Sequence, residues 1–219
     1  MNVAEIKAMA AAFAEDPSQT KYASKYLDAV NRANQQFVMD SKALYKDSAI
    51  VMVSGTASYD LPTDFMYEKM VVLNGIELDP ISRATLGVKA KDYKWEDQQG
   101  TPKYYIIDPE EAKKTITLFP VPNSVDAGTS IVLTYYPFPT ALVNDTDVPL
   151  NGSNLMVQFH QGLAAYAAWL LMTYLQPTDA IIAKKRELLG IYTQKVTDAI
   201  QTFGNTKSEP MRWRMPRVR

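Results

Sequence analysis

The sequence predicts an α+β protein. Residues 1–44 and 150–204 are expected to form a four-helix bundle, residues 45–149 a β-rich domain inserted between its second and third helices, and residues 205–219 an extended tail. Two observations lead to this prediction. Apolar residues recur at helical spacing at both ends of the chain. The middle is rich in β-branched and aromatic residues and is often interrupted by proline and glycine.

The first 44 residues predict two helices. Asn2 is a suitable N-cap for a helix that ends before Pro17, because the residue before a proline avoids the helical region. A second helix is expected from about Gln19 to about Leu44. Its apolar residues form one continuous stripe: Tyr22, Tyr26, Val30, Ala33 and Phe37.

The middle of the chain predicts short strands separated by turns. They are expected at residues 50–53, 70–73, 104–107, 115–119 and 131–136. Asn74-Gly75 lies between two apolar runs, the strongest short signal for a two-residue hairpin turn. A short helix is expected at about residues 83–89.

The last part predicts two more helices. Ser153 or Asn154 can cap a helix that ends near Pro177, and Pro177 or Thr178 opens the final helix. The buried stripe of this final helix is expected to contain Ile181, Leu188, Tyr192, Val196, Ala199 and Phe203, with Gly204 at its end. Two pairs of amphipathic helices cannot bury their stripes separately, so the four are expected to pack together.

Composition excludes several classes of site. The chain has no cysteine, which excludes disulfides, thiolate nucleophiles and cysteine-based metal sites. A single histidine, His160, excludes sites built from several histidines. No apolar run approaches the roughly 20 residues that a membrane span needs. The N-terminal segment is interpreted as an amphipathic helix and not a signal peptide, so no membrane partner is expected.

We expect no enzymatic activity, cofactor or metal. None of the common nucleotide-binding, nucleophile-elbow or zinc-protease motifs occurs. His160 has no evident catalytic partner and is interpreted as a surface or partly buried helix residue. The carboxylates at 96–97 and 108–111 are interpreted as solvated positions, and Asn144–Asp147, which lacks the calcium-loop spacing, as a connecting loop.

The tail differs from the rest of the chain. From Gly204 to Arg219 there are five basic residues and one acidic residue, whereas the whole chain has a net charge of −1. Two prolines favour an extended conformation. Apolar Met211, Trp213 and Met215 then alternate with Arg212 and Arg214, a pattern suited to a groove with acidic edges. The candidate docking residues are Met211, Arg212, Trp213, Arg214, Met215, Pro216, Arg217, Val218 and Arg219.

Several short segments resemble the head-to-tail adaptor, or connector, proteins of short-tailed phages, including the type called tail tubular protein A. Their order and spacing are similar to that family over residues 22–203. The segments are Tyr26-Leu27-Asp28-Ala29-Val30-Asn31-Arg32-Ala33, Tyr59-Asp60-Leu61-Pro62, Val72-Leu73-Asn74-Gly75, Gly100-Thr101-Pro102-Lys103-Tyr104, Leu118-Phe119-Pro120-Val121-Pro122 and Leu133-Thr134-Tyr135-Tyr136-Pro137.

This resemblance implies a structural virion protein that forms a ring, twelvefold in that family, beneath the portal protein. It implies a downstream tail protein as a second partner and double-stranded DNA passing through the lumen without sequence specificity. The location would be the virion neck, and the host cytoplasm during assembly. Two alternatives remain open: a carbohydrate-binding or cell-wall-degrading tail component that uses aromatic residues of the middle region, and a small nucleic-acid-binding protein that uses the tail.

Overall fold

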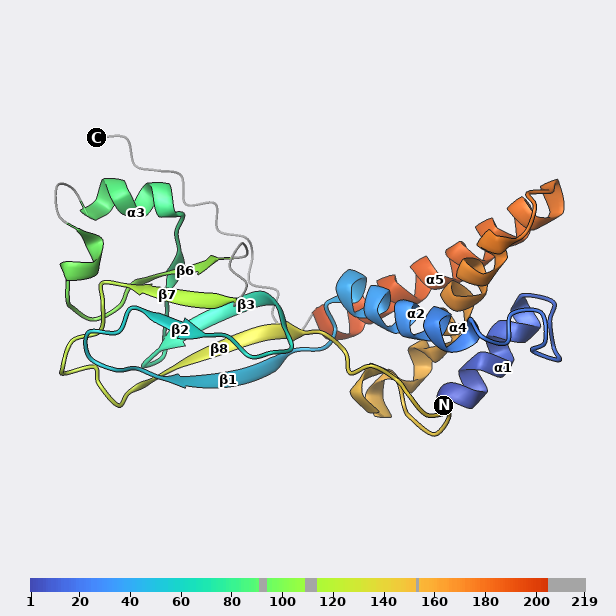
Figure 1. Cartoon of the computed structure of the whole chain (residues 1–219), viewed down its shortest axis with the longest axis horizontal. Helices are drawn as coiled ribbons and strands as arrows, with labels where there is room; N and C mark the ends of the chain where they lie inside the picture. The colour runs from blue at the N-terminus through green and yellow to red at the C-terminus, as the bar shows by residue number, and fades with distance from the viewer. Residues whose placement is uncertain (91–93, 109–113, 153, 205–219) are drawn as a thin grey trace. The chain divides into compact units, whose positions relative to one another are not determined.

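The computed structural model describes residues 1–90, 94–108, 114–152 and 154–204. The protein is α+β, as predicted: four main helices contact each other, and two four-stranded sheets lie between them in the sequence (Figure 1). Residues 45–138 form one compact unit, called the β unit below. The residues before and after them form the other, the helical unit.

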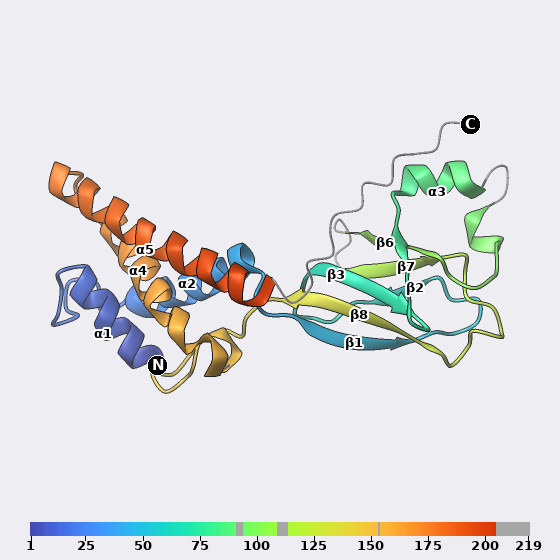
Figure 2. The ribbon, with the colours of Figure 1, turned by 180° about the vertical axis from the view of Figure 1, so that it is seen from behind.

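The helical unit is arranged around α4. Its helices are α1 (Val3–Phe13), α2 (Tyr26–Ser41), α4 (His160–Leu171) and α5 (Asp179–Gly204), with short 3-10 turns at Leu150–Gly152, Asn154–Phe159 and Met172–Tyr174. The helix α4 packs on α1, α2 and α5 (Figure 2). Five alanines and glycines of α4 are buried along with its leucines, so neighbours approach it from several sides: Gly162, Ala164, Ala165, Ala167 and Ala168.

The structure begins α2 seven residues later than the sequence predicts, at Tyr26 instead of Gln19. The cause is Asp16, whose buried carboxylate accepts hydrogen bonds from the backbone N–H groups of Thr20 and Lys21 and from the hydroxyl of Tyr26. These bonds stabilise a turn where a helix was expected. Burial opposes ionisation of Asp16, but the hydrogen bonds outweigh it and hold its pKa below the usual value.

Two asparagines of α2 hold the segment that returns from the β unit. The amide of Asn31 accepts from the N–H of Leu142 at 2.8 Å and donates to its carbonyl at 2.9 Å. One turn later, the buried Asn34 accepts from the N–H of Leu150 at 3.0 Å. Asn31 lies in the segment that carries the family resemblance, and its role here is to fix a backbone far away in sequence.

The β unit contains two sheets. The first has the strand order β1-β8-β3-β4 and is antiparallel, and the second has the order β2-β7-β6-β5 with only the β5–β6 pair parallel. The strands are β1 (Lys46–Val51), β2 (Ser58–Asp60), β3 (Phe65–Leu73), β4 (Ile76–Glu77), β5 (Asp79–Pro80), β6 (Tyr104–Asp108), β7 (Thr115–Phe119) and β8 (Ser130–Pro137).

The main core of the β unit lies between the two sheets. Leu73, Leu133 and Ile131 of the first sheet meet Ile116 and Leu118 of the second, and all five are at most 3% exposed. A smaller cluster covers the other face of the second sheet, where α3 (Arg83–Ala90) contributes the buried Leu86 and the 3-10 turn Trp95–Asp97 contributes Trp95. The layers are therefore α3, the second sheet and the first sheet (Figure 1).

All five predicted strands exist, but β1 and β3 begin earlier than predicted, at Lys46 and Phe65, and two short strands were missed. The hairpin at Asn74-Gly75 is confirmed, with φ of 51° and 79° at the two turn residues, as a type I′ turn requires. The strand β1 begins at Lys46 and not at residue 50, because its first half is polar and forms a sheet edge that apolar periodicity does not reveal. The very short strands β2 and β5 were not predicted.

The third main helix also differs at its start. An α-helix was expected from residue 153 or 154, but Asn154–Phe159 forms 3-10 turns and α4 begins at His160. Such turns are common at the N-termini of α-helices. Among the described residues, no helix combines the length and apolar character needed to cross a bilayer.

Candidate functional site

The predicted docking residues, Met211–Arg219, lie outside the described residues. The described chain ends with α5 at Gly204, so the tail directly follows the longest helix of the protein. The docking role of these residues therefore stays a prediction from the sequence.

His160 was expected at or near the surface, and this expectation is wrong. Its side chain is 0% exposed, and neither ring nitrogen has a hydrogen-bond partner among the described residues. Burial lowers the pKa of His160 to about 4, the positive N-terminal amine adds to this effect, and Glu5 opposes it. An imidazole closed off from solvent cannot reach a substrate, so a general base at this position is excluded.

The two carboxylates of the loop Asn144–Asp147 are engaged by groups of the protein. Asp147 accepts the backbone N–H groups of Val143 and Asn144 at 2.7 and 2.8 Å, which hold its pKa below the usual value. Asp145 pairs with Lys7 of α1 at 2.6 Å. In the described parts of the chain, no cluster of three or more histidine, cysteine or carboxylate side chains is placed to hold a metal. The carboxylates at 109–111 lie outside the described residues.

Many of the described aromatic rings pack against one another. The rings of Tyr166 and Tyr192 are 4.5 Å apart between centroids, and those of Phe37 and Phe159 are 5.9 Å apart. Three of the exposed rings, Tyr45, Phe138 and Tyr174, have a lysine over one face. A sugar-binding platform needs free aromatic faces, and these contacts do not favour one.

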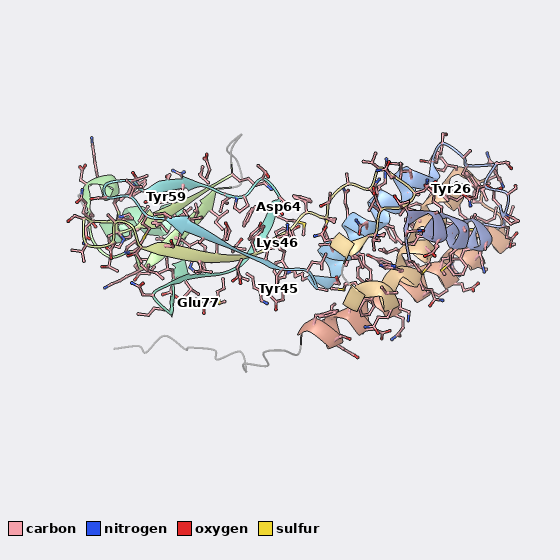
Figure 3. All side chains as sticks on the ribbon, turned by 90° about the horizontal axis from the view of Figure 1, so that it is seen from below. Tyr26, Tyr45, Lys46, Tyr59, Asp64 and Glu77 are labelled. Carbon is pink, nitrogen blue, oxygen red and sulfur yellow. The ribbon has the colours of Figure 1, made fainter. Side chains whose placement is uncertain are left out.

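Asp64 joins the first and last strands of the β unit (Figure 3). Its carboxylate accepts from Lys46 of β1 at 2.7 Å and from the hydroxyl of Tyr135 of β8 at 2.7 Å. Its backbone carbonyl accepts from the N–H of Phe138 at 2.7 Å. Burial opposes its ionisation, but these hydrogen bonds, first that from Lys46, hold the pKa of Asp64 below the usual value.

The other segments that carry the family resemblance also join distant parts of the β unit. The N–H of Gly100 donates to the carbonyl of Val121 at 2.9 Å, and the rings of Tyr104 and Phe119 stack at 6.3 Å. The hydroxyl of Tyr59 donates to the carbonyl of Thr56 at 2.8 Å and closes the loop before β2. The resemblance therefore rests on residues that build the fold, and it does not identify a reactive site.

A groove of about 390 Å³ lies between the 3-10 turns before α4 and the last part of α5. Polar side chains and one phenylalanine line it: Gln158, Phe159, Lys195, Asp198, Gln201 and Thr202. Asp198 is already engaged by the amide of Gln194 at 2.8 Å. The groove is open and has no pair of groups placed for acid–base or nucleophilic chemistry.

The structure adds two apolar surfaces that the sequence interpretation missed. On the first sheet, Val51 and Val132 alternate with core residues and remain 56% and 39% exposed on the outer face. On α5, Ile182, Leu189 and Ile200 lie outside the predicted buried stripe and are 39–45% exposed. Ile182 and Leu189 are 7 residues apart, about two helical turns, and Leu189 and Ile200 are 11 apart, about three turns. The sequence therefore already placed them on one side of the helix. Exposed apolar surface of this kind is typical of assembly interfaces.

The comparisons with known proteins agree with a structural role. The model of one protein family, described as SU10 adaptor protein, matches residues 1–219. Curated proteins give no match. The family is structural, which implies a protein without enzymatic activity, a location in the virion, and links to phage head and tail proteins. The match covers the full length and confirms the resemblance drawn from the sequence: the chain belongs to the SU10 adaptor protein family, whose members are phage head-to-tail adaptors.

Proposed function

We propose that this adaptor forms a ring that docks beneath the portal ring and links it to the downstream tail protein. The ring is twelvefold, as the resemblance implies, and the genome passes through its lumen without base-specific contacts. Membership of an adaptor family supports a link between head and tail. A ring also requires each copy to offer two different surfaces, because a head-to-tail interface that closes generates cyclic symmetry.

The observation that carries the portal contact is the composition of the tail. Met211–Arg219 places four arginines and three large apolar side chains in nine residues that follow α5. Arginine forms bidentate hydrogen bonds with carboxylates, and Trp and Met are effective apolar anchors. We assign the tail to a groove on the portal protein with acidic edges.

Electron microscopy of the full chain mixed with the portal protein of the same phage tests this proposal. The expected result is a ring on the portal for the wild type and no ring for a chain that lacks residues 209–219, with unchanged circular dichroism. Normal assembly of the truncated chain would overturn the tail assignment.

Point variants refine the test. Trp213→Ala removes the central apolar anchor and should weaken portal binding at least tenfold. Arg212→Lys with Arg214→Lys keeps the charge but removes the planar fork, so it should also weaken binding. A tail that instead binds DNA through phosphates would tolerate the lysines and show a steep loss of DNA affinity with salt. Binding of cell-wall saccharides by a monomeric protein would favour the carbohydrate alternative.

A further inference from the structure

One exposed side of α5 is apolar along most of its length. Six residues on this side define what we call the α5 outer face: Ile182, Arg186, Leu189, Thr193, Thr197 and Ile200. All six are exposed, and Arg186 is the only charged one. A solvent-facing side of a surface helix normally has many charged residues. The composition of the α5 outer face therefore indicates that it is covered in the functional assembly.

Two threonines make this face more apolar than the sequence suggests. The hydroxyl of Thr193 donates to the carbonyl of Leu189 at 2.9 Å, and that of Thr197 donates to the carbonyl of Thr193 at 2.9 Å. Both hydroxyls are satisfied within the helix. They need no water or partner group, so a second apolar surface can pack on this face without leaving them unpaired.

Gly190 lies beside these residues and has no packing role within the chain. It is exposed, and a Cβ added there would meet no atom within 4 Å. A glycine inside a helix costs about 1 kcal/mol relative to alanine. Since no described residue of its own chain requires a glycine here, the residue suits a close approach by the backbone of another molecule.

The exposed side of α1 has the complementary properties. Ala4, Ala8 and Ala12 of α1 are exposed one turn apart and form what we call the α1 alanine face. Glu5 lies in the first turn of the same helix, where its carboxylate accepts the N–H of Asn2 at 3.0 Å, and Glu15 lies two residues after the helix ends. The one basic residue of α1, Lys7, is paired with Asp145. Large side chains can pack onto small ones, and these two glutamates have the opposite charge to Arg186.

The two faces occupy different parts of the helical unit. Both α1 and α5 pack on α4, and Figures 1 and 2 show them on different sides of it. Neither Arg186 nor Glu15 has an ion pair with another described residue. One copy can therefore use its α5 outer face while its α1 alanine face contacts a different copy.

We propose that the α5 outer face of one copy packs on the α1 alanine face of the next copy, with Arg186 beside Glu15 in the turn after α1. The contact is heterologous, so its repetition gives a ring when the rotation between copies closes, as the proposed function requires. This inference rests on the ring of the proposed function and names the surfaces that build it.

Disulfide cross-linking tests the contact directly, because the chain has no cysteine of its own. Ala8→Cys and Gly190→Cys are combined in one chain, and Ala8→Cys with Thr193→Cys gives a second register. After assembly on the portal and mild oxidation, at least one double variant should give a ladder of covalent oligomers larger than dimers. The single-cysteine variants should give no such ladder.

The outcomes separate this inference from the proposed function. Rings seen by electron microscopy without a ladder from either double variant would overturn the α1–α5 contact and leave the ring intact. Efficient dimers from Gly190→Cys alone would also overturn it, because they indicate that α5 meets α5. Failure of the wild type to form any ring on the portal would instead contradict the proposed function.

Charge reversal supplies an independent readout. Arg186→Glu should weaken ring assembly at least tenfold, and adding Glu15→Arg should restore it in part. Lys103→Glu makes the same charge change at an exposed position of the β unit and serves as the control. Equal effects of Arg186→Glu and Lys103→Glu would contradict the proposed contact.

Discussion

Tyr192 of α5 donates a hydrogen bond of 2.6 Å to Oδ2 of Asp40 in α2, across 152 positions of sequence. The pKa of Tyr192 is raised above its usual value, first by burial and then by this bond, because both disfavour the phenolate. The contact joins a helix that precedes the β unit to one that follows it. It therefore helps to close the helical unit.

Removal of this hydroxyl should destabilise the protein without disturbing the core. Tyr192→Phe keeps the ring contact with Tyr166 and removes the bond to Asp40, which is partly exposed and can be solvated. A hydrogen bond to a charged group contributes about 1.5–3 kcal/mol, so we expect a loss of about 1–2 kcal/mol in the free energy of unfolding. Urea denaturation measures it, and Tyr174→Phe at an exposed tyrosine should change stability little.

Two helical glycines should respond to alanine with opposite signs. At Gly162 of α4, an added Cβ would lie 2.8 Å from Cβ of Lys195 in α5, so the two helices must move apart. Gly162→Ala should destabilise the isolated chain by about 1–3 kcal/mol. Gly190→Ala meets no atom of its own chain and should stabilise it by about 0.5–1 kcal/mol. Thermal unfolding of the two variants side by side checks both, and equal shifts would contradict this prediction.

The sequence predicted the elements whose apolar spacing is regular. The stripe of α2 is buried from Tyr22 to Phe37, and β7 matches residues 115–119. The start of α2 could not be predicted, because a single carboxylate, Asp16, takes the backbone N–H groups that a helix would use. Local propensity does not reveal such a competitor.

Burial was harder to predict than secondary structure. His160 was interpreted as a surface or partly buried residue because the sequence shows no catalytic partner for it. The structure buries it because α4 has neighbours on several sides. Conversely, Ile182 and Leu189 are exposed although apolar, and their spacing was the signal that could have identified the α5 outer face as a candidate interface. The tail stays a prediction from composition and pattern.

Replacement of the two asparagines of α2 should lower the free energy of unfolding by different amounts. Asn34→Ala leaves the N–H of Leu150 buried without its partner, which costs about 1–3 kcal/mol. Asn31→Ala removes two hydrogen bonds to Leu142, but that site is only partly buried, so water can replace part of them. We therefore expect Asn34→Ala to be at least as destabilising as Asn31→Ala, and Gln35→Ala at an exposed position to be nearly neutral. Hydrogen exchange at Leu142 and Leu150 should locate each loss.

The burial of His160 should make the protein less stable in mild acid. Its pKa is about 4 in the folded protein and 6.5 when exposed, so the unfolded chain binds a proton that the folded chain excludes. The stabilisation by neutral His160 is complete above about pH 6.5 and is lost as pH falls toward 4. At 1.36 kcal/mol for each pKa unit, the expected loss is about 3 kcal/mol. The carboxyl groups of Asp16, Asp64 and Asp147 have pKa values below 3.8, so their protonation lowers stability mainly below about pH 4.

Denaturation between pH 7 and pH 4 measures this dependence. Because the chain has one histidine, its NMR signal reports the folded-state titration without overlap from another imidazole. His160→Leu removes the titrating group and should flatten the stability profile over the same pH range, whereas Gln158→Leu nearby should leave its slope unchanged. A histidine signal that titrates near pH 6.5 in the folded protein would contradict the burial on which the prediction rests, because only a solvated imidazole keeps its ordinary pKa.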